Sequence, residues 1–218
     1  MEETKKKKDT MVKDAIILCL ITLILGAVLA GVYAITKDPI DRAQAKTNNE
    51  ACAKVVADGD TVQDNDQAKV DAATAYFSSH DLANKEVSEG ETLATWVAVK
   101  EVHPTANGGN VYLVDAKKGY GGNVSFALGV DAEGKLTGIS ITAQSETAGL
   151  GANCQNEDWQ AGFAGKVLPS DPSQNMYNKE AANDSQVQAL SGATVTSRAV
   201  TNAVKGVLFC DAAGKGAQ

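Results

Sequence analysis

The chain opens with a long apolar run, and its later hydrophobic positions follow the periods of helices and strands. Residues 15–35 form a stretch of 21 positions without a charged side chain. At 1.5 Å rise per residue this helix would be roughly 30 Å long, about the thickness of the hydrocarbon layer of a membrane. We therefore expect a cytoplasmic N-terminus over residues 1–14 and a transmembrane helix over residues 15–36.

A cleaved signal peptide is the alternative interpretation of this run. Val28 with Ala30, or Val32 with Ala34, has the spacing of a cleavage site. The run is longer than the usual core of about 7–15 residues in a signal peptide, which favours a retained anchor. Basic residues beside a first span tend to stay in the cytoplasm. The four lysines at residues 5–8 thus predict that the main domain is extracytoplasmic.

A polar segment follows the span. Sparse apolar positions between Ile40 and Val56 predict a polar helix, so we assign residues 37–90 to a helical stalk and connecting region. Residues 58–71 are rich in Asp, Asn and Gln and indicate a surface loop, or the start of a short helix that ends near Phe77. Their acidic residues lack the glycine and terminal glutamate spacing of a calcium loop, so no metal site is predicted.

The period changes to two after Gly90. Alternating or β-rich runs at residues 94–99, 111–114, 124–130 and 136–143 predict at least four strands with one buried face. Residues 131–134 supply a hairpin turn that ends in glycine. A helical apolar pattern returns at Val200, Ala203, Val204, Val207 and Leu208. The predicted class is α+β, with an antiparallel sheet packed by helices over residues 91–210 and a tail over residues 211–218.

Candidate chemistry lies where this last helix begins. Ser191, Gly192, Ala193 and Thr194 place hydroxyls among small residues, and Thr194 or Thr196 falls near the helix N-cap. The free amides and dipole of a helix N-terminus favour a bound phosphate. The alternative interpretation is a tight turn and cap without a ligand.

A second small-residue run occupies residues 145–151. Gly149 and Gly151 permit tight bends and close approach of the backbone to a flat ligand, while Glu146 and Thr147 offer polar contacts. The alternative to a ligand-binding loop is an ordinary loop that follows the end of a strand. Trp159 and Phe163 lie four residues apart and indicate the packed face of a short helix.

Charge and cysteine content narrow the possible functions. After Asp14 the chain carries 15 basic and 23 acidic side chains, and such an acidic body excludes nucleic-acid binding as the expected function. Cys52, Cys154 and Cys210 lack the spacing of a zinc or iron–sulfur site. They could form one disulfide, but small buried thiols are the default. A serine hydrolase is supported only by the presence of its residue types.

Several features in sequence order resemble a known family. They are the single N-terminal span, the glycine-rich turn at residues 119–122, the run Glu146-Thr147-Ala148-Gly149-Leu150-Gly151 followed by Trp159 and Phe163, and the run Ser191-Gly192-Ala193-Thr194-Val195-Thr196-Ser197. Together they resemble the G subunit of Rnf-type electron-transport complexes (RnfG) and its relative NqrC, from the sodium-pumping quinone reductase. The resemblance covers most of the chain. The chain is short and has no large insertion, which makes it more similar to RnfG than to NqrC.

The resemblance implies a covalent FMN. In that family the threonine at the position of Thr194 carries FMN through a phosphoester, installed from FAD by a Mg²⁺-dependent flavin transferase. It also implies that the other cofactor-binding residues come from the same two runs: Ser191, Gly192, Ala193, Thr196 and Ser197, with Glu146, Thr147, Gly149, Leu150 and Gly151. Two positions depart from the family pattern: Gln188 stands where Asp is frequent, and Ala148 stands where Pro is frequent.

The function implied is that of a single-pass flavoprotein in the cell membrane. It would relay electrons through FMN within an Rnf-type complex that couples ferredoxin and NAD redox chemistry to ion transport, with the other subunits as partners. The alternatives are an NqrC-like component of a sodium-pumping quinone reductase and a flavin-free extracellular binding or assembly module. The presence of bound flavin separates the last alternative from the other two.

Overall fold

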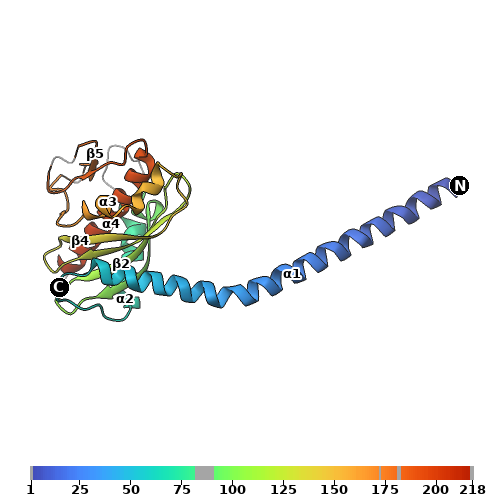
Figure 1. Ribbon diagram of the computed structural model, residues 1–218, viewed down its shortest axis with the longest axis horizontal. Coiled ribbons are helices and arrows are strands. Elements are labelled where there is room, and N and C mark those ends of the chain that lie inside the picture. The colour runs from blue at the N-terminus through green and yellow to red at the C-terminus, as the bar shows by residue number, and fades with distance from the viewer. Residues whose placement is uncertain (1, 82–90, 172, 181–182, 217–218) are drawn as a thin grey trace. The chain divides into compact units, whose positions relative to one another are not determined.

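A computed structural model describes residues 2–81, 91–171, 173–180 and 183–216, with side chains described from residue 13 onward. The predicted boundary between stalk and domain, at residue 90, lies outside the described residues. The chain divides into two compact units, residues 1–46 and 47–218. Figure 1 traces the elements of both units in chain order.

The first unit consists of most of helix α1 (Glu2–Val55). Its apolar side chains between residues 16 and 35 are exposed; Leu29, for example, is 72% exposed and Ile35 is 77% exposed. α1 contains the one helix segment, within the described residues, that is long and apolar enough to cross a membrane. Exposed apolar side chains along a helix of this length fit a segment that spans a lipid bilayer. The predicted span therefore lies on a continuous helix.

The second unit is built on a four-stranded antiparallel sheet with the order β1-β2-β3-β4. The strands are β1 (Val97–Pro104), β2 (Asn110–Ala116), β3 (Val124–Val130) and β4 (Leu136–Ala143). The turn between β3 and β4 was predicted correctly: Gly134 has φ +83° and donates its N–H to the Asp131 carbonyl at 3.1 Å. Residues 94–96 were predicted as strand, but Leu93–Thr95 form a short 3₁₀ helix (η1), after which Trp96 donates its N–H to Leu93.

Helices α4 (Thr194–Gly216) and α2 (Gln67–Ser79) lie with η1 over one face of the sheet (Figure 1). Val200, Ala203, Val204 and Val207 on α4 are fully buried in this core, as the helical period predicted. The helix does not end at residue 210. It continues to Gly216, so residues 211–216 are part of α4 and not a separate tail, and Asp211 is buried.

The opposite face of the sheet is also covered. Ala51, Cys52 and Val55, from the last turns of α1, pack in a second cluster with Val111, Leu113 and Ala127. Every residue of β2 is buried as a result. The predicted buried face is confirmed by the core under α4 and α2, and the end of the predicted stalk supplies an apolar surface that also covers the centre of the other face.

The remaining short elements extend the core. They are η2 (Gly151–Gln155), α3 (Glu157–Ala161) and a two-stranded parallel pair, β5 (Tyr177–Asn178) and β6 (Val187–Gln188). Phe163 is fully buried and meets Trp159 edge to face, with ring centroids 4.9 Å apart. The Trp159 indole donates to the Gln188 carbonyl at 2.8 Å. This contact ties α3 to the segment that leads into α4.

Candidate functional site

A pocket of about 440 Å³ lies where three loop segments meet. Its volume falls within the range of roughly 300–1,000 Å³ typical of small-molecule sites. The lining residues come from the 119–122 turn, from the loop after β4 and from the start of α4: Tyr120, Glu146, Thr147, Leu150, Gly151, Gly192, Ala193, Thr194, Val195 and Thr196. The fold thus brings together the two small-residue runs that the sequence singled out.

Glu146 holds the three segments together. Its side chain is buried, with 8% of the residue exposed. One carboxylate oxygen accepts the Gly121 N–H at 2.9 Å, and the other accepts the Thr196 hydroxyl at 2.5 Å. A buried carboxylate is stable only when such donors replace water. Glu146 was predicted to contact the cofactor; it lines the pocket, and its two hydrogen bonds also shape the pocket wall.

Close approach at Gly151 makes this arrangement possible. A Cβ atom at residue 151 would lie 2.5 Å from both the Glu146 Oε2 and the Thr196 Oγ1. Real Cβ atoms do not come this close to oxygen, so any side chain here would push the carboxylate and the hydroxyl apart. The glycine at this position is explained by the Glu146–Thr196 bond and not by contact with a ligand alone.

The turn before α4 is fixed by a single buried hydroxyl. The Oγ of Ser197 accepts the Leu190 N–H at 2.9 Å and donates to the Ala193 carbonyl at 3.0 Å. Gly192 has φ +72°, a left-handed conformation that favours glycine. Thr194 lies next to the N-cap position, as expected, whereas Thr196 lies inside the first turn and its hydroxyl bonds Glu146 instead of capping the helix. α4 begins at Thr194, the first helical N–H···O bond is from Ser197 to Ala193, and Thr196 is bonded to Glu146.

The hydroxyls near the start of α4 differ in accessibility. Thr196 is 1% exposed and Ser197 is fully buried, whereas Thr194 is exposed and lines the pocket. Ser191 is exposed but does not line the pocket. Thr194 is therefore the one hydroxyl of residues 191–197 that is both exposed and part of the pocket wall.

The predicted site residues separate into two groups. Eight line the pocket: Glu146, Thr147, Leu150, Gly151, Gly192, Ala193, Thr194 and Thr196. Ser191, Gly149 and Ser197 do not. Two lining residues were not predicted, Val195 and Tyr120. Tyr120 is 75% exposed, and the signal that could have identified it was a lone aromatic residue between glycines in the 119–122 turn.

The Cys154 thiol lies near Glu146 and stays protonated at neutral pH. Cys154 is fully buried, and burial, followed by the charge of Glu146, raises its pKa to about 11. Cys19, Cys52, Cys154 and Cys210 are all free thiols, so the disulfide considered from the sequence does not form. Within the described residues no group of three or more His, Cys, Asp or Glu side chains could hold a metal ion.

One cationic group near the start of α4 lacks a complete set of partners. Arg198 follows Thr194 by one helical turn, and side chains at this spacing lie on the same face of a helix. Its guanidinium lies 5.8 Å from the centre of the Trp96 ring. Its Nε is buried and has no hydrogen-bond partner among the described residues. A buried donor of this kind is costly unless an acceptor binds to it.

Comparison with known proteins identifies two matching families. An FMN-binding domain matches residues 119–208, and an RnfG N-terminal region matches residues 1–55. The G subunit of the Na(+)-translocating ferredoxin:NAD(+) oxidoreductase complex of Acetobacterium woodii is 30% identical over 210 residues, covering 93% of this chain and 94% of that protein. The G subunit of the proton-translocating complex of Clostridium ljungdahlii is 29% identical over 194 residues, covering 88% and 85%.

Two solved structures also have similar regions. Shewanella oneidensis NqrC matches with a TM-score of 0.46 and 19% identity, covering 54% of this chain and 61% of that one. The C subunit of the Na(+)-translocating NADH-quinone reductase of Parabacteroides distasonis matches with a TM-score of 0.43 and 20% identity, covering 78% and 94%.

Proposed function

Because the chain belongs to the family of G subunits of ion-translocating oxidoreductase complexes, we propose that it is the membrane-anchored flavoprotein component of an Rnf-type complex. The relatives are subunits of ferredoxin:NAD(+) oxidoreductase complexes, which supports other membrane subunits as its partners. The apolar helix in α1 fits a single-pass membrane protein. The match of residues 119–208 to an FMN-binding domain carries the cofactor assignment.

The residues of the pocket fit FMN. The first-turn amides of α4 have no carbonyl partner within the helix, and the helix dipole favours a phosphate at this end. Tyr120 and Leu150, 75% and 43% exposed, offer apolar surface to a flat ring. These groups suit an anionic phosphate at one side of the pocket and an aromatic ring at the other.

We infer that the phosphate is attached to Thr194. The attachment forms a bond between the Thr194 oxygen and the flavin-proximal phosphorus of FAD and breaks the phosphoanhydride bond. AMP leaves, and the hydroxyl proton is lost. A transferase must reach the nucleophile, and Thr194 is exposed while Thr196 and Ser197 are buried. Both buried hydroxyls also hold other contacts, to Glu146 and to the 190–193 turn.

The chain would position the cofactor, while the bound flavin supplies the one- and two-electron redox chemistry. The Ser197 hydroxyl fixes the turn that presents Thr194, and Glu146 fixes the loop of residues 146–151 opposite to it. We expect this loop to lie against the isoalloxazine and the start of α4 to lie against the phosphate. The four lysines at residues 5–8 support a cytoplasmic N-terminus, which would leave residues 47–218 extracytoplasmic.

Flavin fluorescence in a denaturing gel tests this function. The full chain is co-expressed with a flavin transferase, and its band should fluoresce because covalent flavin survives denaturation. Thr194→Ala should abolish the fluorescence, whereas Thr194→Ser should retain part of it because the nucleophile remains. A dark wild-type band, together with no flavin released from the native protein, would contradict the proposal.

A further inference from the structure

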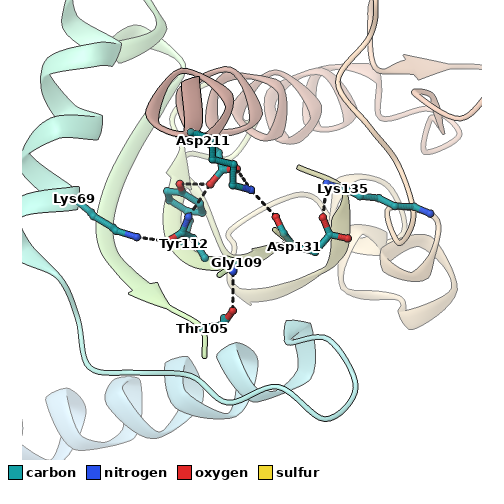
Figure 2. Close-up of polar contacts among 9 residues, drawn as sticks. Lys69, Thr105, Gly109, Tyr112, Asp131, Lys135 and Asp211 are labelled. Carbon is teal, nitrogen blue, oxygen red and sulfur yellow. Dashed lines mark hydrogen bonds and ion pairs between the residues drawn. The ribbon is translucent and has the colours of Figure 1, made fainter. Parts of the chain in front are cut away.

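Three carboxylates are buried among the described residues, and they differ in their charged partners. Asp115, Glu146 and Asp211 are 9%, 8% and 4% exposed. The ammonium group of Lys100 lies 2.8 Å from Asp115 Oδ1, and that of Lys215 lies 2.8 Å from Asp211 Oδ2. Figure 2 shows the Asp211 side chain below α4 with its polar contacts. A nearby cation thus compensates the negative charge of two of these three side chains.

Glu146 is the buried carboxylate without such a cation. Its two oxygens accept the Gly121 N–H at 2.9 Å and the Thr196 hydroxyl at 2.5 Å, and both donors are neutral groups. No Lys, Arg or His side chain in the described part of the chain forms an ion pair with it. Neutral donors stabilise a carboxylate by replacing its water, but they leave its charge in place. The junction between the 146–151 loop and α4 therefore carries one uncompensated negative charge.

This charge borders the pocket proposed for FMN. Of the described residues that line the pocket, Glu146 alone has a charged side chain. Two basic side chains of adjoining segments are directed elsewhere. Lys118 donates to Glu91 at 2.6 Å, and the Arg198 guanidinium lies 5.8 Å from the centre of the Trp96 ring. Neither lines the pocket, so a ligand there meets a negative charge and no positive side chain among the described lining residues.

A flavin in this pocket would feel that charge when it is reduced. Two electrons and one proton convert the neutral oxidised ring into an anion, whereas two electrons and two protons leave it neutral. A bound ring displaces water, and like charges repel one another more strongly in such a medium than in water. Glu146 would therefore oppose the gain of negative charge by the ring and favour the oxidised flavin.

We infer that the charge of Glu146 lowers the reduction potential of the flavin, a role beyond its two structural hydrogen bonds. The inference rests on the proposed function, since it concerns the cofactor proposed for this pocket. The electrons would come from one neighbouring redox subunit of the complex and pass to another, and Glu146 itself is neither oxidised nor reduced. A lower potential makes the reduced flavin a stronger donor to the next carrier.

Anaerobic titration with dithionite and redox mediators tests this inference on the detergent-solubilised full chain, co-expressed with the transferase. Glu146→Gln removes the charge but retains an amide oxygen that can accept the Gly121 N–H. The ratio of reduced to oxidised flavin at a fixed potential should rise at least about tenfold, which raises the midpoint by about 30 mV for a two-electron couple. An unchanged midpoint in Glu146→Gln protein that holds flavin would overturn the inference, whereas wild-type chain without flavin would contradict the proposed function instead.

Thr196→Val is the matched control for the lost hydrogen bond. It breaks the same contact with Glu146 but keeps the carboxylate, so the midpoint should stay at the wild-type value or fall. Glu146→Asp also keeps the charge, on a shorter side chain, and should hold the reduced-to-oxidised ratio within about threefold of wild type. A tenfold rise in either variant would show that the packing of the junction, and not the charge, sets the potential. These two variants decide the question if Glu146→Gln protein retains no flavin.

Glu133→Gln tests whether the effect depends on position. Glu133 is exposed in the turn between β3 and β4 and does not line the pocket. Water and salt screen a charge at such a position, so the reduced-to-oxidised ratio should change by less than about twofold. A shift as large as that of Glu146→Gln would mean that the overall charge of the chain, and not the buried carboxylate, determines the potential.

Discussion

The Thr196 hydroxyl donates to the Glu146 carboxylate across 2.5 Å, joining the start of α4 to the loop after β4. We predict that Glu146→Gln and Thr196→Val each lower the free energy of unfolding by about 2 kcal/mol, because each leaves a buried polar group without its partner. The double variant should lose less than the sum, with a coupling of about 0.5–3 kcal/mol. Urea unfolding measures the cycle. Strict additivity would show that the bond contributes no coupling.

Gly151 provides a second test of the same junction. Gly151→Ala should destabilise the fold by about 1–3 kcal/mol, because the new methyl group would overlap both partners of the Glu146–Thr196 bond. Gly138→Ala on β4 is the control, since a Cβ atom there meets nothing within 4 Å. Its effect should stay within about 0.5 kcal/mol. Thermal melting of the two variants decides the point, and equal melting temperatures would refute the steric explanation.

The buried Cys154 thiol predicts how the free energy of unfolding changes at alkaline pH. Burial, followed by the charge of Glu146, raises the pKa of Cys154 from 9.0 to about 11. Its contribution to stability is thus complete below pH 9 and is lost as pH rises toward 11, because the unfolded chain releases a proton that the folded chain keeps. Cys154→Ala should reduce the loss of unfolding free energy between pH 8 and 10.5. An unchanged pH dependence in this variant would mean that the thiol is not protected.

Tyr120 should affect the flavin and not its attachment. Because the side chain is 75% exposed, Tyr120→Ala should leave the melting temperature of the flavin-free chain nearly unchanged. It should also expose the bound ring to water, seen as a shifted absorption band and altered fluorescence yield, while the covalent flavin content stays at the wild-type level. Identical spectra would remove Tyr120 from the ring site.

Local patterns identified much of this molecule. The apolar run at residues 15–35, the alternation in β3 and the three-and-four spacing at Val200, Ala203 and Val204 each reflect burial of one surface, and each element was found where expected. The two small-residue runs were recognisable because glycine permits left-handed backbone conformations and close approach that other residues do not. Eight of their residues do line one pocket.

Long-range pairings were not visible in the sequence. Thr196 looked like a helix cap because its partner, Glu146, lies 50 positions earlier in the chain. Asp211 looked like part of a polar tail, since nothing nearby reveals that Asn110 and Tyr112 bond to it across the sheet. The packing of Val55 against the second face of the sheet was likewise hidden. A helical stalk and the end of a helix that packs in the core have the same spacing of apolar residues.

Assignment of the modified residue tests the central claim most directly. Trypsin cleaves after Lys179 and Arg198, so one peptide carries Ser191, Thr194, Thr196 and Ser197. Tandem mass spectrometry of this peptide, from chain co-expressed with the transferase, should show the mass of FMN less one water, with fragment ions placing it on Thr194. The same mass located on Thr196, Ser197 or Ser191, or an unmodified peptide from protein that holds flavin, would contradict the account.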